Sequence, residues 1–227
     1  MTNLSHTPPV NACTAAVILL AAVSVACAGR TNTHEALLGL ERFGIESPAP
    51  ERFDVKFETS QGPFVLTVHR KWAPAGADRF YYLVRNGFFN GERFFRVREH
   101  FIAQFGLNGD PAVIASWKHR TIPDDTVRVS NVRGTLAYAM TGPDTRTTQI
   151  YINLSNNEKL DSQGFAPFAQ VISGMDAVDR LYAGYGENAG GGVRAGKQGL
   201  IEKGGNAYLT RAFPKLDYIS RAYVIDK

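Results

Sequence analysis

The chain has 227 residues, 44% of them hydrophobic, which is enough for one well-formed core and excludes a chain that is disordered throughout. The 25 Lys and Arg residues against 21 Asp and Glu residues give a formal net charge of +4, but the basic residues are scattered, so nucleic-acid binding has little support. Both cysteines, Cys13 and Cys27, lie in the first segment, so the remainder can form no internal disulfide.

Residues 1–29 have the features of an export leader. Ala15 to Ala28 form a mostly apolar run, shorter than the about 20 residues that a membrane span needs, which fits a signal-peptide core. Ser24-Val25-Ala26-Cys27 resembles a lipoprotein cleavage site, which would leave an acylated Cys27 for membrane attachment. We therefore expect an exported protein, periplasmic or membrane-anchored. No Lys or Arg precedes Arg30, so a cytoplasmic protein with a mis-assigned start stays open as the alternative.

Residues 30–51 read as a linker, because Ser47-Pro48-Ala49-Pro50 favours irregular backbone. The folded domain is expected at residues 52–227. Arg52 to Thr59 alternates as a strand does, and Phe64 to His69 is expected to pair back after a turn at Gln61-Gly62-Pro63. After Pro74, apolar residues recur at helical spacing and Gly87 stands where a helix would end.

Further strands are predicted at Thr135 to Ala139, Ile150 to Leu154, Phe168 to Ile172 and Leu216 to Ile225, with a second short helix at Met175 to Ala183. Gly184 to Gly199 reads as a glycine-rich loop. Many short strands with few helices favour a β-barrel or a sandwich.

Two stretches set polar side chains among apolar neighbours. On a strand through Ile150, alternation sends Gln149 and Tyr151 to one face and Ile150 and Ile152 to the other. The first face offers an amide and an aromatic ring, which suits a peptide groove. In the stretch from Phe94 to Gln104, Arg96, Ile102 and Gln104 are all at even-numbered positions, so their side chains would lie on one face of a strand. A turn at Glu99-His100 would break this alternation.

With these stretches, the chain from about Phe53 to about Asp226 resembles the cyclophilins, which are peptidyl-prolyl cis-trans isomerases. Three further motifs occur in the family's order: Gly87-Phe88-Phe89-Asn90-Gly91, Gly142-Pro143, and the run from Leu160 to Phe168. The resemblance implies a mainly β fold, a closed antiparallel eight-stranded barrel with two capping helices. It also implies that the partners are proline-containing polypeptides and that no cofactor is required.

Carried over position by position, the resemblance makes Arg96 the catalytic cation and Gln104 the amide that orients it. It implies that the substrate is bound by Phe101, Ile102, Ala139, Met140, Gln149, Tyr151, Leu160 and Phe165. Phe101, Ile102, Tyr151 and Leu160 would form the proline pocket, Gln149 and the backbone near Ala139 and Met140 would hold the peptide, and Phe165 would lie on the rim.

The chain departs from the family pattern at several of these positions. Glu99-His100 stand where the family often has Pro-Gly, and Ile102 replaces a common methionine. Lys159 stands where the cyclosporin-sensitive members carry tryptophan, so weak binding of that drug is expected. Phe165 and Met140 replace a histidine and an asparagine, and neither change is expected to disable catalysis.

Other kinds of site find no support. The histidines lack metal-ligand spacing, and no HExxH, CxxC or Gly-x-Ser-x-Gly motif occurs. The run from Gly184 to Ala189 follows a predicted helix rather than a strand, which argues against a dinucleotide loop. Two functional hypotheses remain: a prolyl isomerase that assists folding outside the cytoplasm, and a barrel that binds proline-containing segments without catalysis.

Overall fold

The computed structural model describes residue 1 and residues 34–38, 48–189 and 198–225. Almost all of the expected leader, with Cys13 and Cys27, lies outside the described residues, as do parts of the linker and of the glycine-rich loop. Residues 34–38 are helical, within the segment expected to be a linker. None of the described helices is both long enough and apolar enough to cross a membrane.

The described chain folds into eight strands, four α-helices after residue 48 and two short 3-10 helices. The strands are β1 Arg52–Thr59, β2 Gly62–His69, β3 Arg96–Arg98, β4 Ile102–Phe105, β5 Thr135–Tyr138, β6 Ile150–Asn153, β7 Pro167–Ser173 and β8 Ile219–Ile225. The helices are η2 Arg70–Trp72, α2 Pro74–Arg85, α3 Pro111–Trp117, η3 Glu158–Gln163, α4 Met175–Asp179 and α5 Gln198–Ala212.

All eight strands belong to one antiparallel sheet in the order β3-β4-β6-β5-β7-β2-β1-β8. The predicted β1–β2 hairpin is confirmed, with Thr59 opposite Gly62 at the turn, where Gly62 has a φ of +112°. That φ is one that glycine adopts far more readily than other residues. The prediction of a mainly β fold with eight antiparallel strands is therefore confirmed.

The two edge strands, β3 and β8, share no ladder in the described sheet. Backbone before β3 is instead hydrogen-bonded to the residues around the start of β8. Phe94 N donates to Asp217 O over 3.0 Å, Gly91 N donates to Ile219 O over 2.7 Å, and Ile219 N donates to the carbonyl of Glu92. The sheet is thus curled, and irregular backbone before β3 contacts the chain at the start of β8.

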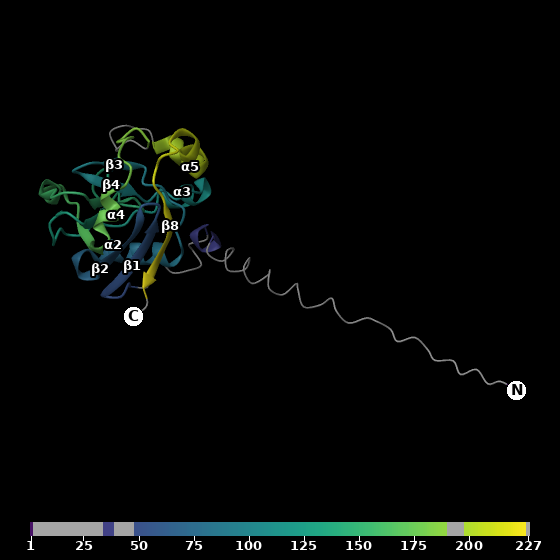
Figure 1. Cartoon of the computed structure of the whole chain (residues 1–227). Coiled ribbons are helices and arrows are strands. Elements are labelled where there is room, and N and C mark those ends of the chain that lie inside the picture. The colour runs from purple at the N-terminus through teal and green to yellow at the C-terminus, as the bar shows by residue number, and fades with distance from the viewer. Residues whose placement is uncertain (2–33, 39–47, 190–197, 226–227) are drawn as a thin grey trace.

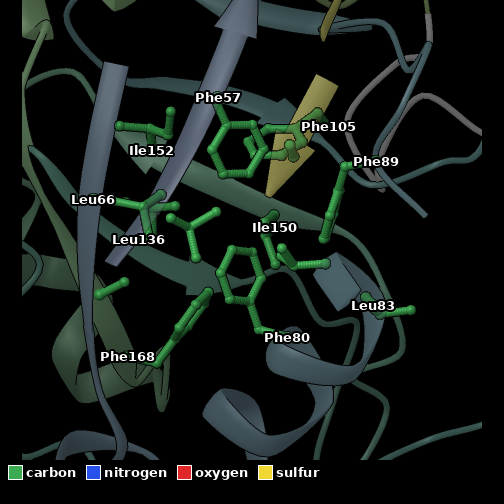
Figure 2. Packing of buried hydrophobic residues seen from close by; sticks show 14 of the residues in the cluster. Phe57, Leu66, Phe80, Leu83, Phe89, Phe105, Leu136, Ile150, Ile152 and Phe168 are labelled. Atoms are coloured by element: carbon green, nitrogen blue, oxygen red, sulfur yellow. The ribbon is translucent and has the colours of Figure 1, made fainter. Parts of the chain in front are cut away.

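The main core lies between the curled sheet and α2 (Figure 2). Phe57 from β1, Phe168 from β7 and Ile150 from β6 are fully buried there, together with Phe80 of α2. The ring of Phe80 lies 5.0 Å from that of Phe168 and 6.4 Å from that of Phe57. Burial of one such side chain contributes about 1.5–3 kcal/mol, so this cluster holds the sheet in its curled form.

Helix α2 confirms the helix predicted after Pro74. Proline at its first turn costs no hydrogen bond there. Ala77, Phe80 and Leu83 repeat at helical spacing and are all completely buried. Gly87 follows the helix with a φ of +68°, so the chain turns back toward β3 where the sequence predicts an ending.

Two further helices, α3 and α5, were not predicted, so the expectation of two helices is wrong in number. Helix α5 begins at Gln198, inside the segment predicted as a glycine-rich loop, and β8 begins at Ile219 rather than at Leu216. Figure 1 shows α5 beside α3. Between them lies a second hydrophobic cluster, the α5 cluster, formed by Phe95, Leu107, Ile114, Ala189, Ile201, Leu209 and Leu216.

Helix α5 is weakly marked in the sequence because Gly204 and Gly205 interrupt it. Gly205 has non-helical backbone angles, φ 49° and ψ −142°, and a side chain there would collide with the carbonyl oxygen of Gly109. The adjacent Asn206 donates its backbone N–H to Gly109 O over 2.9 Å and its side-chain amide to Gly91 O over 2.8 Å. The element is therefore two helical segments joined by a kink at Gly205, and the hydrogen bonds of Asn206 hold that kink against the rest of the fold.

Candidate active site

Strands β3 and β4 form a tight hairpin that places Arg96 and Gln104 on one face. Arg96 lies opposite Gln104, and Arg98 lies opposite Ile102. Opposed residues of an antiparallel pair share a face, so the expected convergence of Arg96, Ile102 and Gln104 is confirmed. His100 in the turn has a φ of +58°, the left-handed conformation that favours glycine, and it stands where the family often has Pro-Gly.

A row of polar side chains runs across the strands from this hairpin. Nη1 of Arg96 donates to Oε1 of Gln104 over 3.0 Å, and Nε2 of Gln104 donates to Oε1 of Gln149 over 2.9 Å. Gln104 is almost fully buried. A buried amide bonded at both ends has little rotational freedom, so Gln104 holds the guanidinium of Arg96 in a defined orientation.

An apolar cluster lies beside this row. Its buried members are Ile102, Ala137, Tyr151 and Leu160, and Phe101, Ala139 and Phe165 pack against them while remaining partly exposed. The rings of Tyr151 and Phe165 meet edge to face with centroids 6.0 Å apart. The predicted proline-pocket residues Phe101, Ile102, Tyr151 and Leu160 therefore lie together, with Phe165 at the edge.

The row and the cluster face a cavity of about 690 Å³, the site cavity. It is lined by every predicted site residue except Gln149: Arg96, Phe101, Ile102, Gln104, Ala139, Met140, Tyr151, Leu160 and Phe165. Gln149 lines a neighbouring cavity of about 350 Å³. Its amide is hydrogen-bonded to Gln104 and to Gln198 of α5, at 2.9 and 3.0 Å.

Asn131, which sequence reasoning missed, supports the apolar wall. It is completely buried, and its Oδ1 accepts from the hydroxyl of Tyr151 over 3.0 Å. Its Nδ2 donates to Asp161 Oδ1 over 2.7 Å and to the carbonyl of Phe165 over 2.8 Å. One side chain thereby ties β6 to the 3-10 helix η3 and to the rim. Asn131 lies in a loop with no motif around it, so the sequence carried no signal for it.

The electrostatics of this wall follow from its burial. Burial raises the pKa of the Tyr151 phenol, which therefore stays a neutral hydrogen-bond donor. Burial also opposes ionisation of Asp161, but hydrogen bonds from Ser130 and Asn131 outweigh it and hold the pKa of that carboxyl below its ordinary value. Asp161 is thus a charged anchor for the Asn131 side chain.

Glu187 is the second site residue that sequence reasoning missed. Its Oε1 lies 2.5 Å from Nη2 of Arg96 and 3.4 Å from Nη1 of Arg98. The hydrogen bond from Arg96 holds the pKa of Glu187 below its ordinary value. Glu187 lies in the loop after α4, distant in sequence from both arginines, so no spacing pattern could have connected them.

The cationic groups around the site cavity gather on Phe101. Arg96, Arg98 and Lys159 place their charged ends 5.8, 5.3 and 5.7 Å from the centre of its ring. Nε of Arg96 is buried and has no hydrogen-bond partner among the described residues.

In the described part of the chain, no three His, Cys, Asp or Glu side chains gather as metal ligands would. The site offers a fixed guanidinium, an amide partner and an apolar hollow. Such a set can bind an apolar ring and hydrogen-bond a polar atom beside it.

Comparison with known proteins gives a consistent result. Residues 54–197 match the family described as cyclophilin type peptidyl-prolyl cis-trans isomerase/CLD. The chain is 35% identical over 136 residues to a peptidyl-prolyl cis-trans isomerase of Acinetobacter baylyi, covering 56% of this chain and 70% of that protein. It is 32% identical over 155 residues to peptidyl-prolyl cis-trans isomerase B of Escherichia coli, covering 64% of this chain and 88% of that protein.

The fold is similar to that of a cyclophilin type peptidyl-prolyl cis-trans isomerase from Cryptosporidium parvum, with a TM-score of 0.57 and 17% identity. That match covers 78% of this chain and 99% of the other. The family match spans more than half of the sequence and contains both the arginine hairpin and the apolar cluster. This chain belongs to the cyclophilin-type peptidyl-prolyl cis-trans isomerase family.

Proposed function

We propose that this protein catalyses cis-trans isomerisation of X-Pro bonds with Arg96 as the catalytic residue. The observation that carries the proposal is the position of the guanidinium. Its side chain is only 14% exposed and lines the site cavity beside an apolar wall.

The reaction requires no bond to break. The barrier to rotation is about 18–20 kcal/mol because the C–N bond has partial double-bond character. As the bond twists, conjugation is lost and the proline nitrogen becomes a hydrogen-bond acceptor. A fixed N–H donor at that nitrogen stabilises the twisted state more than either planar isomer, which is the condition for catalysis. The guanidinium of Arg96 stays charged throughout and presents its donors in a rigid fork.

The apolar wall would receive the proline ring. Ile102, Tyr151 and Leu160 are each less than 8% exposed and form its floor, and Phe101 stands beside Arg96. Water excluded by these side chains strengthens the hydrogen bond that Arg96 donates. The chain beyond β5, at Ala139 and Met140, lines the same cavity and would lie along the peptide backbone.

Proline-containing polypeptides are the proposed substrates. Another structure of the Cryptosporidium parvum protein was obtained in the presence of the dipeptide Ala-Pro, and the chain matches it with a TM-score of 0.56. We further propose that the sheet acts as a closed barrel, with the backbone bonds between residues 91–94 and 217–219 as its seam. The seam keeps β3, and with it Arg96, in place.

The proposed setting is outside the cytoplasm, where the protein would assist folding. The support is the apolar run from Ala15 to Ala28 and the lipoprotein-like sequence that ends at Cys27. The mass and lipid content of the mature N-terminus test this. An acylated Cys27 supports a membrane-anchored lipoprotein, whereas an intact, unmodified N-terminus supports the cytoplasmic alternative.

A proline-peptide assay that compares the parent with Arg96→Ala tests the activity. The parent is expected to accelerate exchange and Arg96→Ala to lose most of that acceleration. Equal rates would remove Arg96 from the mechanism. A parent that binds a proline peptide without accelerating exchange would select the non-catalytic binding barrel.

A further inference from the structure

The guanidinium of Arg96 is held at two points that come from different parts of the chain. Gln104, its neighbour across the β3–β4 hairpin, accepts from Nη1 over 3.0 Å. Glu187, from the loop after α4, accepts from Nη2 over 2.5 Å. Two acceptors at the two ends of a planar group fix its plane, and they leave one further N–H on each of Nη1 and Nη2.

The loop that carries Glu187 is itself packed in place. Two residues before Glu187, the ring of Tyr185 lies between Tyr182 and Phe213, at centroid distances of 5.0 and 5.1 Å. Two residues after it, Ala189 is 1% exposed within the α5 cluster. A residue flanked at two positions on each side by packed side chains has few alternative positions, so the fold presents the carboxylate to Arg96.

The carboxylate of Glu187 also offsets the repulsion between the positive charges of Arg96 and Arg98. Arg96 and Arg98 are two residues apart on β3 and so share a face. Both guanidinium groups approach the same oxygen of Glu187, at 2.5 and 3.4 Å. Without this carboxylate, two cations would face each other beside the site cavity with Gln104 as the only hydrogen-bond partner of Arg96 among the described side chains.

We propose that Glu187 is a positioning residue for the isomerase reaction, acting by holding the Arg96 guanidinium in a fixed orientation at the site cavity. This inference rests on the proposed role of Arg96. It assigns a function to the loop after α4, residues 185–189, which carries a side chain of the site into place. The alternative is that the Glu187 carboxylate inhibits the enzyme by occupying Arg96 and has to move away before substrate binds. That alternative predicts a faster enzyme when Glu187 is removed.

The test uses NMR exchange spectroscopy on a proline peptide at saturating concentration with the full chain, so that on-protein exchange is separated from binding. Glu187→Ala is expected to slow exchange about tenfold, equivalent to about 1.4 kcal/mol, while the peptide Kd changes less than about twofold. Glu187→Gln keeps the shape and an acceptor oxygen, so its rate is expected between those of the parent and Glu187→Ala. The double variant Arg96→Ala with Glu187→Ala is expected to be no slower than Arg96→Ala alone.

Asp179→Asn is the matched control. It removes a carboxylate that lies 2.5 Å from Arg133 on the surface, outside the site, and is expected to leave the exchange rate unchanged. Circular dichroism and thermal unfolding of Glu187→Gln report whether the fold is kept.

An exchange rate for Glu187→Ala equal to or above that of the parent would overturn the inference, as would a loss that adds to that of Arg96→Ala. If the parent accelerates exchange and Arg96→Ala does not, either result leaves the proposed function standing. A parent that fails to accelerate exchange would overturn the proposed function and the inference with it.

Discussion

Arg96 and Gln104 lie directly opposite each other in the β3–β4 pair, and Nη1 of the arginine donates to Oε1 of the glutamine over 3.0 Å. The contact is a consequence of strand register, because any slip by one residue would send one of the two side chains to the other face. The hairpin therefore sets the orientation of the proposed catalytic group before any substrate binds.

Removing the amide of Gln104 is expected to impair catalysis more than binding. Gln104→Ala deletes the side chain that accepts from Arg96 and donates to Gln149. The guanidinium then keeps only one of its two side-chain acceptors among the described residues, Glu187. We expect kcat/KM for a proline peptide to fall about tenfold, equivalent to about 1.4 kcal/mol. Gln104→Glu keeps an acceptor for Arg96 and is expected to lose less. Parental activity in Gln104→Ala would contradict this role.

The Asn131 network is expected to matter for stability far more than the hydroxyl of Tyr151 does. Asn131→Ala strips the contacts to Tyr151, Asp161 and Phe165, and should lower the free energy of unfolding by about 3 kcal/mol. In Tyr151→Phe the ring stays in the wall, and Asn131 Oδ1 still accepts from Asn153 over 3.2 Å. That variant should cost about 1 kcal/mol and keep its activity. Chemical denaturation and the isomerase assay check both variants. Similar losses of stability in Asn131→Ala and Tyr151→Phe would contradict the greater importance of the Asn131 network.

Docking of α5 is expected to depend on Gly205. Gly205→Ala would force a side chain against the Gly109 carbonyl at a backbone conformation with a φ of 49°, and should destabilise the protein by about 2 kcal/mol. Gly199→Ala serves as the control, because a side chain there meets nothing within 4 Å and alanine favours the helix. Thermal unfolding of the two variants should therefore move in opposite directions, and a neutral Gly205→Ala would be evidence against tight docking.

Activity is expected to be insensitive to pH until the solution is strongly acidic. Arg96 hydrogen-bonds Glu187 and holds its pKa below the ordinary value of 4.5, and Arg98 faces the same oxygen. Because the pKa is lowered in the folded state, the ion pair is fully present above the ordinary value and is lost as the pH falls through the lowered one. The isomerase rate should be flat between about pH 6 and pH 8 and decline only at a pH lower than the ordinary carboxyl pKa.

Glu187→Gln has no carboxylate to protonate at this position, so it should lack that acidic decline while the protein remains folded. A decline of the same size in Glu187→Gln would assign the pH effect to another group, such as Asp161.

Local patterns predicted the parts of the fold that depend on neighbours in sequence. Alternation placed Ile150 and Ile152 in the core and Tyr151 in the site wall, because the side-chain period of a strand is two. The β1–β2 hairpin and α2 followed from a Gly-Pro turn and from apolar residues at helical spacing. The residues taken from the family resemblance came together around the site cavity, with Gln149 behind them in the polar row.

Long-range placement could not be predicted in this way. Helix α5 was missed because Gly204 and Gly205 weaken its local pattern, whereas its stability comes from the α5 cluster and from the bonds of Asn206 to distant carbonyls. Helix α3 was overlooked although Asp110 and Pro111 mark its start, with the Asp110 side chain accepting from Ala112 N over 2.7 Å. Glu187 reaches Arg96 only through tertiary packing of its loop, which leaves no trace in sequence spacing.

The most direct measurement of the central claim is on-protein exchange of a proline peptide bound to Arg96→Lys, compared with the parent under saturation. Lysine keeps the positive charge but lacks the planar fork that Gln104 and Glu187 hold. We expect a Kd within about threefold of the parent and an exchange rate lower by at least about tenfold. An Arg96→Lys protein that exchanges the bound peptide as fast as the parent would contradict it.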